Sequence, residues 1–381
     1  MEFDDYRSLF PVTEKNIFLN HAAASPASLR VLNAVTGFYR ECVEQASRNY
    51  FKWMKRVEKT RRRAAHLINA ETNEIAFTGN TSDGISAVAW GFKWKRNDGV
   101  IVAAPDFPSN IYPWMHLEQR GVNVHFFQRK ENRFGVKEVE KALKPNTKML
   151  AVSSVDYASG FAANIEELGD FCKKKGILLC LDAIQSLGVI PIDVKKSGVH
   201  FLASGGHKWL TGPMGIGILF IDKSVNNLVM PVRTGWKSVI NEEDFNIDFT
   251  LKPDALRFET GTMNLAGIFG LDAALALLQE VGISEIYKKV MAVIDLFIER
   301  LEERKLEITS PLKNRERSGI LTFRPKGDPE ACYKFLVKRD IMLSLRNNMI
   351  RLAPHFYNNE SDVDGFFHKL DMFDQKDPHF S

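Results

Sequence analysis

A short glycine-rich stretch carries the first group that could do chemistry. It is SGGHKWLTGPMGIG, residues 204–217, and it places Lys208 between a histidine and a tryptophan. Glycine-rich patterns are common at turns, and a lysine in a turn is often only a solvated cation. An amine fixed in such a turn can also form a Schiff base with an aldehyde. The stretch alone leaves both interpretations open.

Two other stretches add groups of complementary chemistry. CLDAIQSLG, residues 180–188, places Asp182 at the end of an apolar run, where an unpaired carboxylate costs several kcal/mol. We therefore expect Asp182 to have a cationic partner. FTGNTSDGI places Gly79, Asn80 and Thr81 between an expected strand and the start of a helix, where backbone amides form an anion cradle. It contains neither a P-loop nor a G-x-G-x-x-G pattern.

Together these three features match the requirements of pyridoxal phosphate. The cofactor needs an anchored phosphate, an acidic partner for its pyridinium nitrogen and an amine for its Schiff base. Each feature alone is a weak signal. Their combination in one expected sheet indicates a pyridoxal phosphate site.

The surrounding elements must position these residues. Seven apolar or β-branched runs indicate buried strands, at residues 74–79, 99–105, 123–128, 148–155, 176–183, 200–206 and 215–222. Helical patterns lie between them, and the alternation predicts an α/β fold with a mostly parallel sheet covered by helices on both faces. Ligands of such sheets bind at the carboxyl ends of the strands, where Asp182 and Lys208 are expected.

The pattern changes on either side of this sheet. Residues 265–305 predict a long helical region broken near Gly282, followed by a small α+β lobe. Before the sheet, the first long helix is expected to begin with Ser25 as its N-cap and Pro26 at its first position. A chain of 381 residues is long enough for two lobes and a deep cleft.

Composition excludes several classes of function. Hydrophobic residues make up 45% and charged residues 26% of the chain, as in soluble globular proteins, and no long apolar run predicts a membrane span. The acidic N-terminus lacks the pattern of a secretory signal, so we expect a cytoplasmic protein. The net charge of +4 is small beside 51 basic and 47 acidic residues, which disfavours a nucleic-acid partner. The four cysteines have no C-x-x-C spacing, so neither disulfides nor a metal site are expected.

The chain resembles the class V aminotransferase family of fold-type I pyridoxal phosphate enzymes, which includes cysteine desulfurases, kynureninase and isopenicillin N epimerase. Besides the stretches above, the resemblance is carried by FLNHAAAS, DFPSNIYPW, SSVDYASG, RFETGTMNLAGIFGL and IRLAPHFYNNESDVDGF, and it runs almost end to end. It implies a large pyridoxal phosphate-binding domain at residues 20–260 with a mostly parallel seven-stranded sheet. It also implies a small α+β domain formed by residues 1–19 and 261–381.

The resemblance implies a role for each matching position. Lys208 would carry the cofactor as a Schiff base and move protons at the substrate α-carbon, while Asp182 would keep the ring nitrogen protonated. Gln185 would hydrogen-bond the phenolic oxygen of the ring, and Phe107 would stack on the ring. The residues expected to hold the phosphate are Gly79, Asn80, Thr81, Ser204 and His207. The residues expected from the other chain of a homodimer are Trp236, Gly261 and Thr262.

Plainer interpretations of several of these residues stay open. Gln185 could be an ordinary residue at the start of a helix, and Phe107 could be a routine core residue. His207 could be a histidine at a strand end with no ligand. Arg351 could be a surface cation.

The resemblance also suggests the substrate and the reaction. Arg351 matches the position that binds a substrate carboxylate through a bidentate guanidinium pair. Asn20, His21 and Tyr157 are the other expected substrate-binding residues. The main hypothesis is transamination or β-elimination of an α-amino acid, for instance at a C–S bond, through an aldimine and a quinonoid. The alternative is an epimerase, with Tyr157 or His21 as a second acid or base facing Lys208.

One departure from the family bears on the reaction. Cysteine desulfurases need a mobile cysteine ahead of the carboxylate-binding arginine, and residues 340–350 contain none. Cys332 falls within an expected amphipathic helix, where a buried thiol is expected. A persulfide-forming desulfurase is therefore disfavoured, although desulfurase-like or selenocysteine lyase-like activity without that cysteine stays an alternative. A silent interaction module is the least favoured, because Lys208, Asp182 and Arg351 are all present.

Overall fold

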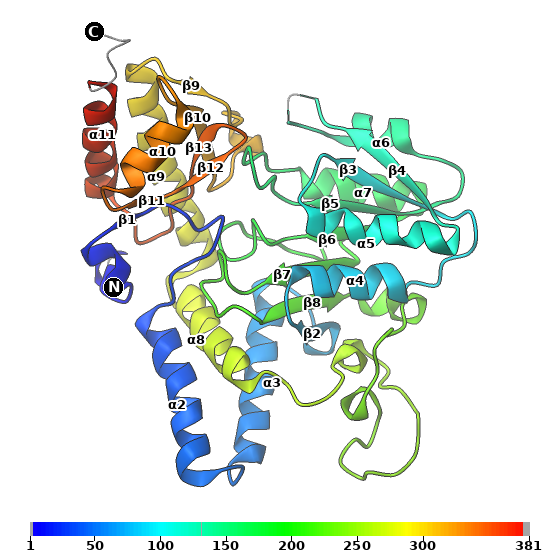
Figure 1. The fold of residues 1–381 in the computed structure, drawn as a ribbon. Helices are drawn as coiled ribbons and strands as arrows, with labels where there is room; N and C mark the ends of the chain where they lie inside the picture. The colour runs from blue at the N-terminus through cyan, green and yellow to red at the C-terminus, as the bar shows by residue number, and fades with distance from the viewer. Residues whose placement is uncertain (1–2, 131, 376–381) are drawn as a thin grey trace.

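A seven-stranded sheet forms the centre of the larger lobe (Figure 1). The computed structural model describes residues 3–130 and 132–375. The strands, in their order across the sheet, are β2 (Ile75–Thr78), β8 (Gly217–Ile221), β7 (Phe201–Gly205), β6 (Leu178–Asp182), β5 (Thr147–Ser153), β3 (Gly99–Ala104) and β4 (Asn123–Gln128). All neighbouring pairs are parallel except those made by β8, which is antiparallel to both β2 and β7. The predicted mostly parallel seven-stranded sheet is confirmed.

Helices bury both faces of this sheet because alternate residues of its strands point to opposite sides. On β5, Leu150 and Val152 enter one apolar cluster, whereas Met149 and Ala151 enter the other. The first cluster includes residues of α3 (Tyr50–Leu67), α6 (Val136–Ala142), α7 (Ile165–Lys175) and α8 (Leu265–Val281), and it continues into the smaller lobe. The helices contributing to the second cluster are α4 (Thr81–Gly91) and α5 (Tyr112–Met115).

The second lobe is a small α+β unit, at the upper left of Figure 1. Its antiparallel sheet has the order β12 (Ser344–Arg346), β13 (Met349–Leu352), β10 (Leu321–Arg324) and β9 (Glu307–Ile308). Its helices are α9 (Ile283–Glu303), α10 (Pro329–Val337) and α11 (Glu360–Asp374). The two-residue strand β1 (Ile17–Phe18) pairs in parallel with β11 (Ile341–Met342), so the N-terminal segment, which begins with α1 (Phe3–Arg7), is joined to this lobe.

The predicted break in the long helical region is confirmed at Gly282. Its φ of 88° separates α8 from α9, and a glycine adopts such a value without the steric cost that other residues carry. In the described part of the chain, no single helix is long and apolar enough to cross a membrane. The pair α8 and α9 meets that requirement only when taken together, and the two are bent by 77° to each other.

The predicted start of the first long helix is wrong by three residues. Helix α2 (Leu29–Gln45) begins after Ser28, whose hydroxyl accepts a hydrogen bond from the Val31 amide at 3.3 Å. Ser25 lies in an extended segment and donates its hydroxyl to the Lys208 carbonyl at 2.6 Å. Both serines are good cap residues, and the contact with the Lys208 turn determines which of them starts the helix.

Candidate active site

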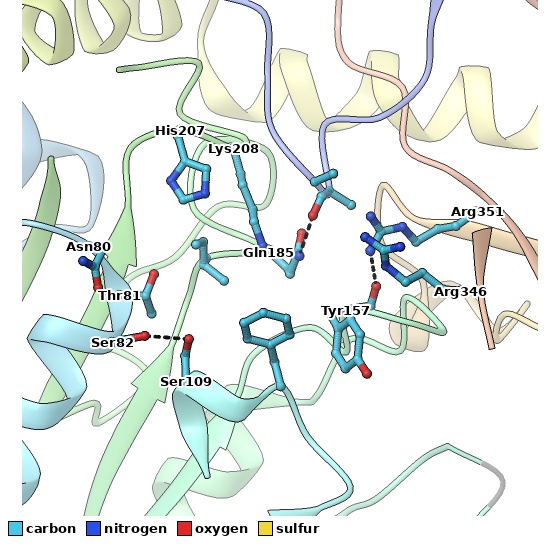
Figure 2. A pocket seen from close by; sticks show the side chains of 14 residues that line it. Asn80, Thr81, Ser82, Ser109, Tyr157, Gln185, His207, Lys208, Arg346 and Arg351 are labelled. Atoms are coloured by element: carbon cyan, nitrogen blue, oxygen red, sulfur yellow. Dashed lines mark hydrogen bonds between the residues drawn. The ribbon is translucent and has the colours of Figure 1, made fainter. Parts of the chain in front are cut away.

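One cavity of about 320 Å³ collects half of the predicted site residues at the carboxyl ends of the strands. Figure 2 shows their side chains converging from both lobes. The predicted residues that line it are Asn80, Thr81, Phe107, Tyr157, Gln185, His207, Lys208 and Arg351. The other lining residues are Ala22, Ala23, Ser82, Ser109, Ile184 and Arg346.

Lys208 lies in a tight turn just after β7. Gly188, with a φ of 105°, makes room for this turn, because a Cβ on Gly188 would lie 2.4 Å from the Trp209 carbonyl oxygen. The lysine is 8% exposed, and its Nζ lies 5.6 Å from the centroid of the Phe107 ring. Burial lowers the pKa of Lys208 to about 8, against the opposing effect of the Asp182 carboxylate. At pH 7 about a tenth of this amine is therefore unprotonated, a few hundredfold more than for an ordinary lysine, and able to act as a nucleophile.

Asp182 ends β6 and is 2% exposed. Its Oδ1 accepts a hydrogen bond from the Ile184 amide at 2.9 Å. Among residues 3–130 and 132–375, no lysine, arginine or histidine forms a direct ion pair with it, so the expected cationic partner is not in direct contact, and the charge of Lys208 only partly offsets its burial. Burial raises the pKa of Asp182 to about 7. A buried carboxylate without a direct ion pair fits a protonated pyridine nitrogen, which would supply an adjacent positive charge.

The start of α4 forms one end of the cavity. The Asn80 side chain caps this helix by accepting a hydrogen bond from the Asp83 amide at 3.0 Å, and the Thr81 hydroxyl accepts one from the Gly205 amide at 2.9 Å. The first amides of a helix have no carbonyl partner within it, so this end suits a phosphate. His207 lies beside it, and burial followed by the Lys208 charge lowers the pKa of its imidazole.

Phe107 and Gln185 flank Lys208 in the cavity. The Phe107 ring packs edge-to-face on Tyr157, with centroids 5.2 Å apart, and remains 41% exposed. Gln185 is buried, donates its amide to the Ala22 carbonyl at 3.0 Å and accepts from the Trp209 indole at 2.9 Å. These two bonds fix its side chain, and its Nε2 retains a second hydrogen for a ligand.

Arg351 approaches the cavity from β13 in the small lobe. It is 1% exposed, and it donates Nη1 to the Tyr157 carbonyl at 2.6 Å and Nη2 to the Ser344 hydroxyl at 3.3 Å. Its Nε is buried without a hydrogen-bond partner. Burial and the nearby Arg346 charge lower the pKa of Arg351 to about 10. A buried guanidinium with an unused N–H fits an incoming carboxylate.

Several predicted residues lie outside this cavity. His21 is fully buried, with Nδ1 2.9 Å from the Ala353 carbonyl and Nε2 2.7 Å from the Tyr357 hydroxyl. Asn20 accepts a hydrogen bond from Ser344 at 2.5 Å and so supports β12 from behind. Ser204 is buried and donates to the neighbouring Gly205 carbonyl at 3.3 Å. The neighbours of His21 that do line the cavity are Ala22 and Ala23.

A separate pocket contains the residues predicted to serve a partner chain. It has a volume of about 190 Å³, and Gly79, Gly261 and Thr262 are among the residues that line it. Trp236 lies next to Gly261, because a Cβ on that glycine would be 3.3 Å from the indole nitrogen. Within one chain, therefore, these residues lie outside the Lys208 cavity.

The sequence-based residue set omitted Ser82, Ser109 and Arg346. Ser82 donates its hydroxyl to Ser109 at 2.7 Å and so links the start of α4 to the Phe107 loop. Arg346 could have been found from the stretch SLRNNMIR. A two-residue Asn-Asn turn places residues 344, 346, 349 and 351 on one face of a hairpin, which puts Arg346 beside Arg351.

No cysteine lines the cavity. Cys332 is fully buried within α10, as predicted, and burial raises the pKa of its thiol to about 12. Cys172 and Cys180 are also buried, and Cys42 lies in α2. The β12–β13 connection consists only of Asn347 and Asn348, so it has no loop that could carry a thiol to Lys208.

The fold and the cavity define a pyridoxal phosphate-dependent enzyme that acts on amino acids. Residues 17–366 match the family model described as Aminotransferase class-V, and the chain belongs to this family. It is 30% identical to a probable cysteine desulfurase of Pyrococcus abyssi, over 97% of this chain and 96% of that protein. It is 28% identical to the uncharacterized aminotransferase YcbU of Bacillus subtilis, over 94% and 95% of the two chains.

Solved structures share the whole fold. A cysteine desulfurase from Thermococcus onnurineus NA1 superposes with a TM-score of 0.87 at 26% identity, covering 97% of both chains. The cystine C–S lyase C-DES has the same fold, with a TM-score of 0.87 at 22% identity, covering 95% of this chain and 98% of the lyase. The predicted fold class, family and cofactor are thereby confirmed.

Proposed function

We propose that this enzyme removes a proton from the α-carbon of an amino acid at the Lys208 cavity, and that transamination or β-elimination follows without a protein persulfide. The observation that carries the proposal is the presence, at one end of the sheet, of Lys208, whose pKa is lowered to about 8, and of the buried Asp182, which has no direct ion pair among the described residues. When bound, pyridoxal phosphate supplies an aldehyde that condenses with amines and a ring that accepts electrons from the α-carbon.

We assign residues in and beside the cavity to either the cofactor or the substrate. We assign the pyridinium nitrogen to Asp182, the ring face to Phe107 and the phenolic oxygen to Gln185. We assign the phosphate to the start of α4 together with His207, because the first amides of a helix have no carbonyl partner within it. Arg351 binds the substrate carboxylate, supported by its unpaired buried Nε.

Lys208 is the base in this proposal. Its unprotonated amine takes the proton from the α-carbon and can return it to a neighbouring position. His21 is not a second base, because both of its ring nitrogens are already engaged and it does not line the cavity. Tyr157 lines the cavity, but Figure 2 shows its hydroxyl directed away from Lys208, which gives the epimerase alternative little support.

The absence of a cysteine from the cavity lining separates this proposal from a persulfide-forming desulfurase. Such chemistry needs a thiolate that reaches the substrate sulfur. Cys332 is buried with its pKa raised to about 12, and the two-residue β12–β13 turn brings no other cysteine near Lys208. Sulfur released from a substrate would therefore leave as a free product.

We further propose a homodimer in which each chain supplies Trp236, Gly261 and Thr262 to the partner's phosphate site. Large apolar side chains support this interface because they are more than two-thirds exposed, at Val43, Phe51, Phe245 and Phe249. Mixing the Lys208→Ala and Thr262→Glu variants tests the shared site. The mixed dimer would contain one site with both native residues, so activity should return on mixing and should stay absent if the sites are not shared.

The domain division proposed from the sequence places α8 in the second domain, although this helix packs against α2 and α3 beside the large sheet. We propose residues 20–260 as the pyridoxal phosphate-binding domain, and residues 1–19 with 261–381 as the second domain. The parallel pairing of β1 with β11 supports the assignment of the N-terminal segment to the second domain. The cavity then lies where the two domains face each other.

Product analysis tests the reaction. The purified protein with pyridoxal phosphate is incubated with a panel of amino acids and assayed for keto acids, pyruvate, alanine and sulfide. Pyridoxamine phosphate with a keto acid would indicate transamination, and pyruvate with unchanged cofactor would indicate elimination. Alanine formed from cysteine together with sulfur bound covalently to the protein would contradict the proposal.

A further inference from the structure

Two guanidinium groups face the substrate end of the cavity without an acidic partner. Arg346 and Arg351 both line it, and Figure 2 shows their side chains side by side. Within residues 3–130 and 132–375, neither arginine forms an ion pair, and the one hydrogen bond from Arg346 goes to the Leu345 carbonyl at 2.8 Å. Two neighbouring cations repel each other, so this end of the cavity favours anionic ligands.

The hairpin holds Arg346 in this position. Strands β12 and β13 pair in antiparallel register, with Ser344 opposite Arg351 and Arg346 opposite Met349. Asn347 and Asn348 form the two-residue turn, with φ values of 50° and 59° that match a type I′ hairpin. Arg346 is therefore the last residue of a strand that ends at a tight turn, not part of a long loop.

The cofactor phosphate does not account for Arg346. Figure 2 shows Asn80, Thr81 and His207 on one side of Lys208, with Arg346 and Arg351 on the other. A single substrate carboxylate accounts for Arg351, whose buried Nε has no partner. Arg346 is left as an exposed cation at the mouth of the same cavity.

We propose that Arg346 binds a second anionic group, on the side chain of the amino-acid substrate, and so selects acidic amino acids. This inference rests on the proposed function of the same cavity, because it assigns the α-carboxylate to Arg351. Arg346 is a binding residue that determines specificity and takes no part in the proton transfer at Lys208.

Matched ligands that differ only in the second charge test this proposal. The holoenzyme is titrated calorimetrically with succinate against succinamate and with glutarate against glutaramate, none of which has an amine that can react with the cofactor. The same preference is measured as kcat/KM for aspartate against asparagine and glutamate against glutamine. We expect at least one acid to bind about tenfold more tightly than its half-amide, as for one charge-assisted contact.

Two variants test whether the preference for the acid over its half-amide depends on Arg346. Arg346→Gln should reduce it to about twofold or less while the half-amide binds as before, and Arg346→Lys should retain part of it. Equal binding of acid and amide by the native enzyme would overturn the proposal, as would a preference that survives Arg346→Gln. If Arg346→Gln weakened binding of both the acid and its half-amide, the proposal would also be overturned, because Arg346 would then bind the α-carboxylate together with Arg351.

Turnover of neutral amino acids and attachment of the cofactor to Lys208 distinguish a failure of acidic selectivity from a failure of the proposed function. If neutral amino acids are turned over and Lys208 carries the cofactor, the proposed function stands while acidic selectivity fails. If Lys208 carries no cofactor, the proposed function itself fails.

Discussion

The two ends of the cavity differ in whether their ionisable groups titrate near neutral pH. At the sheet end, burial moves the pKa of Lys208 down to about 8 and that of Asp182 up to about 7. At the hairpin end, Arg351 keeps a pKa of about 10 despite burial, so it stays a cation at neutral pH. Groups that titrate near neutral pH can exchange protons with a substrate, whereas a permanent cation can only attract and orient it. We therefore call the sheet end, with Lys208 and Asp182, the chemical end of the cavity, and the hairpin end, with Arg351, its binding end.

The largest expected effect is at the chemical end. Lys208→Ala removes both the amine that carries the cofactor and the proposed base, so kcat should fall by at least about a thousandfold. Calorimetric binding of succinate should remain, because the hairpin end is unchanged. Steady-state kinetics measure kcat, and the titration measures succinate binding. If succinate binding fell as much as kcat, the two ends would not have separate roles.

Asp182→Asn should stabilise the cofactor-free protein in a pH-dependent way. The folded-state pKa of Asp182 is about 7 against an ordinary 3.8, so the folded state holds a proton that the unfolded state has lost between these values. Stability of the native chain therefore falls as pH rises through that window, and the asparagine variant escapes this loss. The gain should be on the order of 4 kcal/mol at pH 8 and below about 1 kcal/mol at pH 4.

Urea unfolding at several pH values measures this gain. Asp170→Asn is the matched control, because Asp170 is exposed on α7 and its substitution should change stability little at any pH. A stabilisation by Asp182→Asn that is the same at every pH would contradict the account of a buried carboxylate without a direct ion pair.

At the binding end, Arg351→Gln should raise KM more than it lowers kcat. Loss of a buried, charge-assisted contact to a carboxylate corresponds to about a tenfold to hundredfold fall in kcat/KM. Absorbance of the bound cofactor in the absence of substrate should be unchanged. A fall in kcat alone, with KM unaltered, would mean that Arg351 acts in the chemical step, as Lys208 does, and not in substrate binding.

The smallest expected effect is at Cys332. Cys332→Ala should leave turnover within about twofold of the native value, because a buried thiol with a raised pKa supplies no thiolate. A complete loss of activity with cysteine as substrate, in a protein that still folds by circular dichroism, would restore a persulfide mechanism.

Much of the fold and of the chemical end could be predicted from sequence. Apolar runs bounded by glycines located the strands, and residues just after those strands, such as Thr81 and Lys208, do line the cavity. The start of α2 was missed because Ser25 and Ser28 are equally good caps, and only the tertiary contact of Ser25 with Lys208 separates them.

The binding end was less accessible to sequence reasoning. His21 lies in a stretch that matches the family, but its ring is buried between Ala353 and Tyr357, which are more than 300 residues away in the chain. Arg346 was omitted because its position beside Arg351 depends on the register of a hairpin, which a shift of one residue would reverse. That Asp182 makes no direct ion pair among the described residues likewise becomes visible only when all its neighbours are placed.

The central claim is that Lys208 is the amine that joins covalently to pyridoxal phosphate. Reduction of the holoenzyme with borohydride, followed by peptide mapping, tests it most directly. We predict a stable phosphopyridoxyl group on Lys208 in the peptide that contains SGGHKW. The same group on another lysine, or a protein that takes up no cofactor, would contradict the account.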